Sequence, residues 1–287
     1  MAPEITAFFD EPTFTVTYLV IDPKSKAAAI IDPVLDYDHA SGRAHRTSAE
    51  RVLEVARSKQ ARIDYVLETH VHADHLSAAP WIKAQTGATV AIGAHVRDVQ
   101  RIFRPIFGAD DVSLEGAEFD LLAEDGQTVS LGELTIQAMH TPGHTPACVS
   151  WKVGHADVFV GDTLFMPDYG TARADFPGGD AATLYRSIQK LLALPDETRL
   201  WMCHDYKAPG RDEYAWQSTV GDQRAYNIHL RHDVDEAAYV SMRKARDATL
   251  KAPALLLPSV QVNMRAGNLP PAESNGVTYL KIPVTLA

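Results

Sequence analysis

The sequence predicts a layered fold that mixes α-helices and β-strands, of α/β or α+β class. Short runs rich in β-branched and aromatic residues, which favour strands, recur between stretches whose apolar residues have helical spacing. Several strand-like runs also follow one another directly, so the pattern departs from a regular alternation of strand and helix. With 287 residues, 46% of them apolar, the chain can bury a sizeable core.

The N-terminal part begins with a predicted β-hairpin, residues 13–22 and 26–32, joined by the turn Pro23-Lys24-Ser25. The polar residues 36–46 are expected to form a loop. Apolar residues at helical spacing predict a helix over 47–60, with Thr47 or Ser48 as its cap. Further along, the pattern predicts a strand at 64–68, a helix that starts at Leu76, a strand at 88–92 and a helix at 95–103.

The following part is richer in strands and ends in a change of composition. The predicted elements are three short strands within 118–141, strands at 147–153, 157–161 and 199–203, and a helix at 180–193. Residues 222–250 are expected to be helical, and residues 252–287, rich in Pro and Gly, irregular. Because no linker or repeat is visible, we expect one domain over 1–287, with a core of about 13–220 and a C-terminal extension of about 222–287.

Charge and cysteine content limit the partners and the cellular compartment that we expect for this protein. The chain carries 27 Lys and Arg against 37 Asp and Glu, a formal net charge of −10 at pH 7. An acidic surface repels phosphate backbones, so no nucleic-acid partner is expected. Cys148 and Cys203 cannot form a disulfide framework, and no secretory leader or membrane-spanning apolar run is visible. These features predict no membrane partner and a reducing, cytoplasmic setting.

The densest group of metal-ligand residues is Glu68-Thr69-His70-Val71-His72-Ala73-Asp74-His75, where three histidines and one aspartate fall within six residues. Imidazole and carboxylate groups are common ligands for first-row metals. His70 and His72 are two residues apart, so on extended backbone they face the same side. Asp74 and His75 diverge and are expected to serve a second, neighbouring metal position. A competing role for Asp74 is the N-cap of the following helix.

Three further candidate ligands each follow a predicted strand. His144 lies in the turn Thr141-Pro142-Gly143-His144-Thr145, Asp162 in Gly161-Asp162-Thr163, and His204 in Cys203-His204-Asp205-Tyr206. A Pro-Gly turn can present an imidazole at a fixed angle, and a carboxylate at a strand end can bind one metal or bridge two. The candidates are enough for two metals: His70, His72, Asp74, His75, His144, Asp162 and His204.

In this order, the His-x-His-x-Asp-His segment, the Pro-Gly-His-Thr turn, Gly-Asp-Thr and the late histidine resemble the metallo-β-lactamase superfamily over about residues 13–230. The resemblance implies an α+β fold, a four-layer αββα sandwich, with metals at the edge where the two sheets meet. Here the sandwich would carry a C-terminal helical extension.

Within that superfamily, the chain is most similar to two branches that act on glutathione derivatives, glyoxalase II and persulfide dioxygenase. Three segments resemble the second branch: Thr171-Ala172-Arg173-Ala174-Asp175-Phe176, Cys203-His204-Asp205-Tyr206 and Asn263-Met264-Arg265-Ala266-Gly267. Ala174 and Ala266 differ from that branch's residues. The resemblance implies a non-haem iron dioxygenase that oxidises glutathione persulfide with O₂ to sulfite and glutathione.

The same resemblance implies one Fe(II) per chain, held by His70, His144 and Asp162. His72 would be a fourth ligand or a hydrogen-bond partner of a ligand. Asp74, His75 and His204 would line an empty second site and orient water and substrate. Arg173, Arg265 and Tyr206 are the residues expected to contact substrate, since a guanidinium can bind a carboxylate through two hydrogen bonds.

Other interpretations use the same residues. In a glyoxalase II-like hydrolase, two Zn²⁺ bridged by Asp162 would activate water against a thioester such as S-lactoylglutathione. A metal-free scaffold and a β-lactamase are weaker alternatives. Cys148 and Cys203 are read as buried core residues rather than reactive thiols. The expected partners are glutathione persulfide or a related small thiol derivative and O₂, and a homodimer is compatible with this interpretation.

Overall fold

The computed structural model describes residues 2–231 and 234–284. Its first large sheet has six strands in the spatial order β1-β2-β3-β6-β8-β9. These are β1 Glu4–Asp10, β2 Thr15–Ile21, β3 Ala27–Ile31, β6 Arg62–Leu67, β8 Thr89–Gly93 and β9 Leu121–Ala123. The first three pair antiparallel, which confirms the predicted hairpin, and the last four pair parallel. Edge strand β1 is not among the predicted elements.

The second large sheet also has six strands, in sequence order from β10 to β15. They are β10 Thr128–Leu131, β11 Leu134–His140, β12 Val149–Val153, β13 Asp157–Phe159, β14 Arg199–Trp201 and β15 Gln217–Thr219. All neighbours pair antiparallel except β13 and β14, which are parallel because helix α4, Ala181–Leu192, connects them.

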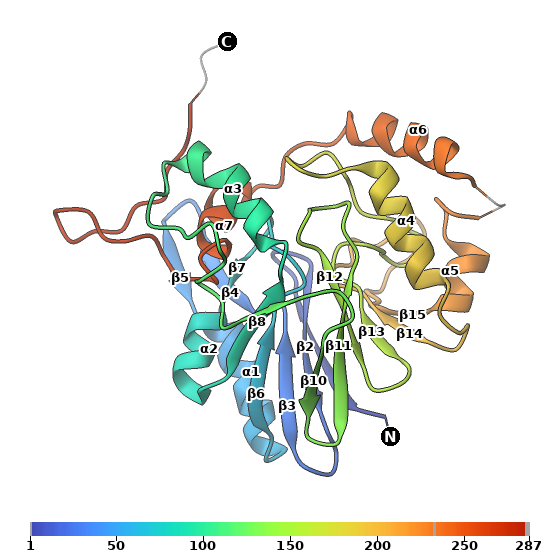
Figure 1. Cartoon of the computed structure of the whole chain (residues 1–287), viewed down its shortest axis with the longest axis horizontal. Coiled ribbons are helices and arrows are strands. Elements are labelled where there is room, and N and C mark those ends of the chain that lie inside the picture. Colours follow the sequence, from blue (N-terminus) through green and yellow to red (C-terminus); the bar gives the residue numbers. More distant parts are fainter. Residues whose placement is uncertain (1, 232–233, 285–287) are drawn as a thin grey trace.

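The helices cover the outer faces of the two sheets (Figure 1). The first sheet carries α1 Thr47–Ser58, α2 Ala79–Thr86, α3 Val96–Phe107 and α7 Leu256–Asn263. The second carries α4, together with α5 Val220–Tyr226 and α6 Glu236–Asp247. The order helix, sheet, sheet, helix is the four-layer αββα sandwich of α+β class that the resemblance implied. Across the described residues, no helix combines the length and apolar character that a membrane crossing requires.

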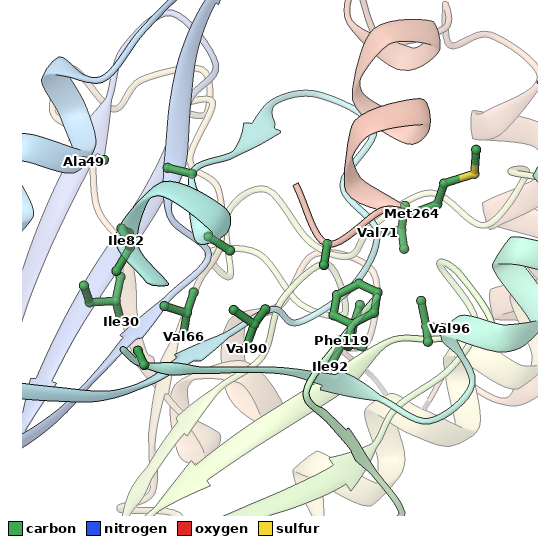
Figure 2. Packing of buried hydrophobic residues seen from close by; sticks show 14 of the residues in the cluster. Ile30, Ala49, Val66, Val71, Ile82, Val90, Ile92, Val96, Phe119 and Met264 are labelled. Carbon is green, nitrogen blue, oxygen red and sulfur yellow. The ribbon is translucent and has the colours of Figure 1, made fainter. Parts of the chain in front are cut away.

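Strand alternation places three cores between the four layers. In β2, Val16, Tyr18 and Val20 face the second sheet, whereas Leu19 and Ile21 face the helices. Such strands are buried on both faces, which explains their nearly continuous apolar sequence. Figure 2 shows the outer core of the first sheet, where Met264 at the end of α7 lies beside Val71 and close to Phe119.

Several predictions of local structure are wrong. Residues 36–46 are not a loop, because β4 Val34–Asp38 and β5 Arg43–His45 form an antiparallel hairpin. The segment from Leu76 begins with the short strand β7 Leu76–Ser77, which pairs with β4, before α2 starts. Neither Thr47 nor Ser48 caps α1. The Ser48 hydroxyl and backbone N–H instead donate to Asp36 at 2.6 and 3.0 Å.

The C-terminal extension is also more ordered than the sequence suggests. Within the region 222–250, which was predicted to be helical, the described residues form α6 and most of α5, and residues 232–233 lie outside the described residues. The region 252–287 is not irregular throughout, because α7 lies within it and packs into the outer core of the first sheet. That the whole chain forms one domain stays a prediction. The extension nevertheless reaches both sheets, since α6 packs over the second and α7 over the first.

The candidate ligands follow the C-terminal ends of β6, β11, β13 and β14. A β-bridge between Thr15 and His204, and a hydrogen bond of 2.7 Å from Val16 N to the Cys203 carbonyl, join the two sheets at this edge. The sandwich therefore brings four segments that are distant in sequence together at this edge of the two sheets.

Candidate metal centre

The segment after β6 carries three buried histidines, each with one ring nitrogen engaged. His70 Nδ1 lies 3.0 Å from Thr69 Oγ1, which itself donates to Asp32 Oδ2 at 2.8 Å. His72 Nε2 lies 2.9 Å from Asp32 Oδ1, and His75 Nδ1 lies 3.3 Å from Thr15 Oγ1. Such contacts fix ring orientation and tautomer and leave the second nitrogen free for a metal.

Two glycines shape the turns that present His144 and Asp162. Gly143 has φ +136°, and a Cβ there would lie 2.3 Å from the Leu184 backbone. Gly161 has φ +52°, and a Cβ there would lie 2.7 Å from Thr69 Cβ, in the loop that follows β6. Larger residues would therefore push these turns away from their neighbours.

His144 also depends on the C-terminal extension. Its Nδ1 donates to the Arg173 carbonyl at 2.8 Å. Helix α6 holds the segment around Arg173, because the buried Arg243 donates to the Thr171 carbonyl at 3.0 Å and Asp247 Oδ2 accepts from Ala174 N at 2.9 Å. The orientation of one candidate ligand is thus supported from a helix some 100 residues further along the chain.

One grouping consists of His70, His144 and Asp162, whose potential ligand atoms lie within 4.8 Å of one another. His144 Nε2 is 3.6 Å from Asp162 Oδ2. This is a set of two histidines and one carboxylate on three different segments. His72 belongs to three other groupings that meet the same distance: with Asp74 and His75, with Asp32 and Glu68, and with Cys203 and His204.

The remaining candidates lie on the other side of Asp162. His204 Nε2 is 3.4 Å from Asp162 Oδ1 and 3.3 Å from Asp74 Oδ2, and Asp74 Oδ2 is 3.3 Å from His75 Nδ1. Asp162 therefore stands between two sets of ligands. Asp74 is not the N-cap of α2, because Ala78 holds that position.

Unpaired buried atoms test whether these residues fit a metal. Among the described residues, five atoms of this cluster are buried without a hydrogen-bond partner: His70 Nε2, His72 Nδ1, His75 Nε2, His204 Nε2 and Asp162 Oδ1. Buried polar atoms are nearly always paired, so such a concentration indicates a bound cation as the missing partner. Burial also lowers the pKa of His70 well below its usual value, with neighbouring His72 and His144 adding to the effect, which keeps the imidazole neutral, as a ligand requires.

Sequence reasoning missed two carboxylates beneath the centre. Asp32 and Glu68 are buried and flank His72, with Glu68 Oε2 3.3 Å from its Nε2. Burial opposes protonation of His72, but the Asp32 and Glu68 carboxylates outweigh burial and raise its pKa well above the usual value. Asp32 follows strand β3, so the strand-end rule that selected Asp162 could have selected it as well.

A cavity of about 350 Å³ opens onto Asp74, His144 and Asp162. Its lining includes two kinds of residue: the aromatic Phe14, Phe165, Tyr169, Phe176 and Tyr206, and the basic Arg173, Arg243, Arg246 and Lys251. Burial, together with the Asp162 and Asp74 charges, raises the pKa of Tyr206 well above its usual value, so its hydroxyl stays protonated.

The two arginines that were predicted to contact substrate lie in different places. Arg173 lines the cavity, but it already makes two hydrogen bonds to Asp175, at 2.6 and 2.8 Å, and a third to the Lys251 carbonyl. Arg265 is not brought to this cavity. It lies beneath the C-terminal segment and donates twice to Asp111, at 2.7 and 2.8 Å, which corrects its placement as a substrate contact.

Cys148 and Cys203 are both buried and unpaired. Burial raises the pKa of Cys148 to about 12 and that of Cys203 well above its usual value, so neither is a thiolate near neutral pH. We expect iodoacetamide to leave both unmodified in the native protein at pH 8 and to label both after denaturation, as measured by mass spectrometry. Labelling in the native state would restore the reactive-thiol interpretation.

Comparison with known proteins agrees with this geometry. The family model described as the metallo-beta-lactamase superfamily matches residues 10–204. The chain belongs to the metallo-β-lactamase superfamily. It therefore carries the metal-binding site of histidines and aspartates that the unpaired atoms indicate, in a metal-dependent enzyme scaffold.

Relatives within the superfamily carry different functional names. A probable metallo-hydrolase of Burkholderia pseudomallei is 55% identical and covers 98% of each chain. Glyoxylase B2 of Dictyostelium discoideum is 43% identical over 98% of this chain and 97% of its own. The mitochondrial persulfide dioxygenase ETHE1 of Homo sapiens is 29% identical over 90% and 87%. The crystal structure of ETHE1 from Myxococcus xanthus superposes with a TM-score of 0.74 at 27% identity, covering 92% of this chain and all of that one.

Proposed function

We propose that the protein is a persulfide dioxygenase that oxidises glutathione persulfide at one Fe(II) per chain. In this reaction one persulfide, one O₂ and one water give one glutathione, one sulfite and two protons. The terminal sulfur gains both oxygen atoms of O₂, the S–S bond breaks, and water supplies the third sulfite oxygen. Glutathione leaves as the thiol.

The observation that carries the proposal is the compact set of His70, His144 and Asp162 within 4.8 Å. Two histidines and one carboxylate that leave other positions open are typical of non-haem Fe(II) oxygenases. Iron held there would supply the redox chemistry that lets O₂ react with a sulfur anion. The 29% identity to human persulfide dioxygenase over most of both chains is in keeping with this proposal.

The other residues of the centre would act on protons and on orientation. The Tyr206 hydroxyl, kept protonated by burial, is suited to donate a hydrogen bond to the persulfide. Asp74 and His204, 3.3 Å apart beside Asp162, are suited to hold the water that completes sulfite. His72, held through Nε2 by Asp32 at 2.9 Å, would bind the iron through Nδ1 only on losing the proton that its raised pKa favours, and would otherwise donate from Nδ1 to a ligand.

The cavity wall also suits a glutathione carrier, which bears carboxylates on a small peptide. Arg246 lines the cavity and is exposed, and its guanidinium makes no ion pair or hydrogen bond with another described residue. It is therefore a better candidate than Arg173 or Arg265 for binding a substrate carboxylate.

Replacing Arg246 by alanine should raise the KM for glutathione persulfide about 2–13-fold at unchanged kcat, because it removes one hydrogen bond that stabilises binding by about 0.5–1.5 kcal/mol. Steady-state oxygen uptake measures both constants. Lys244→Ala is the matched control, because Lys244 lies on the same helix but does not line the cavity. Equal KM values for the two variants would remove Arg246 from the substrate site.

A thioester hydrolase is the second candidate, and one observation favours it. Asp162 stands between two ligand sets, with Asp74, His75 and His204 forming the second, an arrangement that suits two Zn²⁺ sharing a bridging carboxylate. The names metallo-hydrolase and glyoxylase B2 among the relatives agree with this alternative.

The two functions differ in their requirement for O₂. We expect the protein to consume O₂ only when glutathione persulfide is present, with one sulfite formed for each O₂, and to leave S-lactoylglutathione intact. Hydrolysis of S-lactoylglutathione without O₂ uptake would select the hydrolase instead.

A further inference from the structure

The loop that carries the candidate ligands is poorly stabilised by hydrogen bonds of its own backbone. Residues 70–75 adopt neither helix nor strand, and in the described part of the chain no hydrogen bond joins their backbone to another backbone group. The loop nevertheless holds three histidines and Asp74 in fixed positions. A catalytic centre tolerates only small displacements of its ligands, so the loop requires support from elsewhere.

Asn263, the last residue of α7, provides that support. Its buried side-chain amide donates to the His72 carbonyl at 2.9 Å and to the His75 carbonyl at 2.8 Å. Its Oδ1 accepts from Ser77 N at 2.9 Å. One side chain from the C-terminal extension thus satisfies three main-chain groups, two on candidate ligands of the loop and one in the strand β7 that follows it.

Asn263 is itself firmly placed. The following Met264 is fully buried beside Val71, and its carbonyl accepts from Gln100 on α3 at 3.0 Å (Figure 2). The turn after α7 approaches β7 and α2 so closely that a Cβ on Gly267 would lie 2.8 Å from the Ser77 carbonyl and 2.6 Å from Pro80. The Asn263 amide therefore fixes the loop relative to the closely packed helix α7.

We propose that Asn263 is a positioning residue that holds the His70–His75 loop in its metal-binding conformation. It touches neither metal nor substrate and acts through the backbone of His72 and His75. The C-terminal extension is then part of the metal centre. This proposal rests on the assignment of the ligands but not on the choice between dioxygenase and hydrolase.

The test compares Asn263→Ala with Gln261→Ala. Gln261 lies two residues earlier on the same helix and is equally buried. Its side chain also makes three hydrogen bonds, but to Leu257 and Lys281 rather than to the loop. Both variants lose the same number of bonds, so loss of stability alone should affect them alike.

The measurement is the affinity of the purified, metal-free protein for Zn²⁺ or Fe²⁺ alone, by competition with a chromophoric chelator. We expect Asn263→Ala to bind about 10-fold or more weakly, as for other residues that support metal ligands, and Gln261→Ala to keep the wild-type affinity. Bound Co²⁺ should show an altered visible spectrum in Asn263→Ala only, since that spectrum reports ligand geometry.

Equal affinities for Asn263→Ala and the wild type, or equal losses in the Asn263 and Gln261 variants, would overturn the proposal. Should Asn263→Ala not fold, the milder Asn263→Ser decides by the same criteria. His70→Ala serves as a reference: if it still binds metal with wild-type affinity, the ligand assignment has failed rather than the role of Asn263.

Discussion

The Asp162→Ala variant is expected to lose both the bound metal and the activity. Asp162 is the carboxylate of the compact three-residue set, and it also lies 3.4 Å from His204 of the second set. Losing a residue that merely supports a ligand already costs about 10–100-fold in metal affinity, so losing this ligand should cost more than about 100-fold. Metal analysis of the purified variant, together with oxygen uptake on glutathione persulfide, measures both effects.

Asp157→Asn is the matched control for this experiment. Asp157 opens the strand that Asp162 follows, is also buried, and pairs with Arg199 and Trp201 at 2.7 and 2.9 Å. Its loss should lower the free energy of unfolding while leaving the metal content intact. An Asp162→Ala protein that kept its full metal content would show that the ligand assignment is wrong.

The second large effect is expected for Asp32→Asn. Asp32 accepts from Thr69 N at 2.7 Å, from Thr69 Oγ1 at 2.8 Å and from His72 Nε2 at 2.9 Å. An amide cannot accept all three, because one of its two positions is itself a donor. Since Asp32 has φ +49°, which asparagine also tolerates, the variant removes acceptors without adding backbone strain.

For Asp32→Asn we expect about 10–100-fold weaker metal binding and a loss of about 2–3 kcal/mol in the free energy of unfolding. Chelator competition and urea denaturation measure these two quantities. Asp22→Asn is the control, because Asp22 is a buried strand-end carboxylate that accepts from Ser25 and Glu133 away from the centre. If both variants kept wild-type affinity, Asp32 would have no role in orienting the ligands.

Local signals in the sequence were enough to select the histidines and aspartates that the structure brings together. His70, His72, Asp74 and His75 lie within one segment, and His144, Asp162 and His204 each follow a strand, so spacing and strand ends were sufficient to select them. The resemblance then supplied the four layers, which no local pattern encodes.

The supports of the centre were predictable only in part, because Asp32 follows a strand end whereas Asn263 carries no such signal, and the contacts of both are visible only in the folded chain. Asn263 contacts the ligand loop across 186–191 residues of sequence, and Asp32 contacts Thr69 across 37, so only the folded chain brings them together. Arg265 was misplaced for the related reason that a guanidinium in a sequence does not reveal its partner, here Asp111. The hairpin at 34–45 was missed because β5 is exposed and β4 is mostly half-buried, so neither strand shows a continuous apolar pattern.

The most direct test of the account is a titration of metal-free protein with Fe²⁺ under anaerobic conditions, followed by oxygen uptake on glutathione persulfide. The account predicts that activity rises linearly and reaches its maximum at one iron per chain, with Zn²⁺ unable to replace it. Activity that reaches its maximum at two Zn²⁺ per chain, or iron-loaded protein that consumes no O₂ with the persulfide, would contradict it.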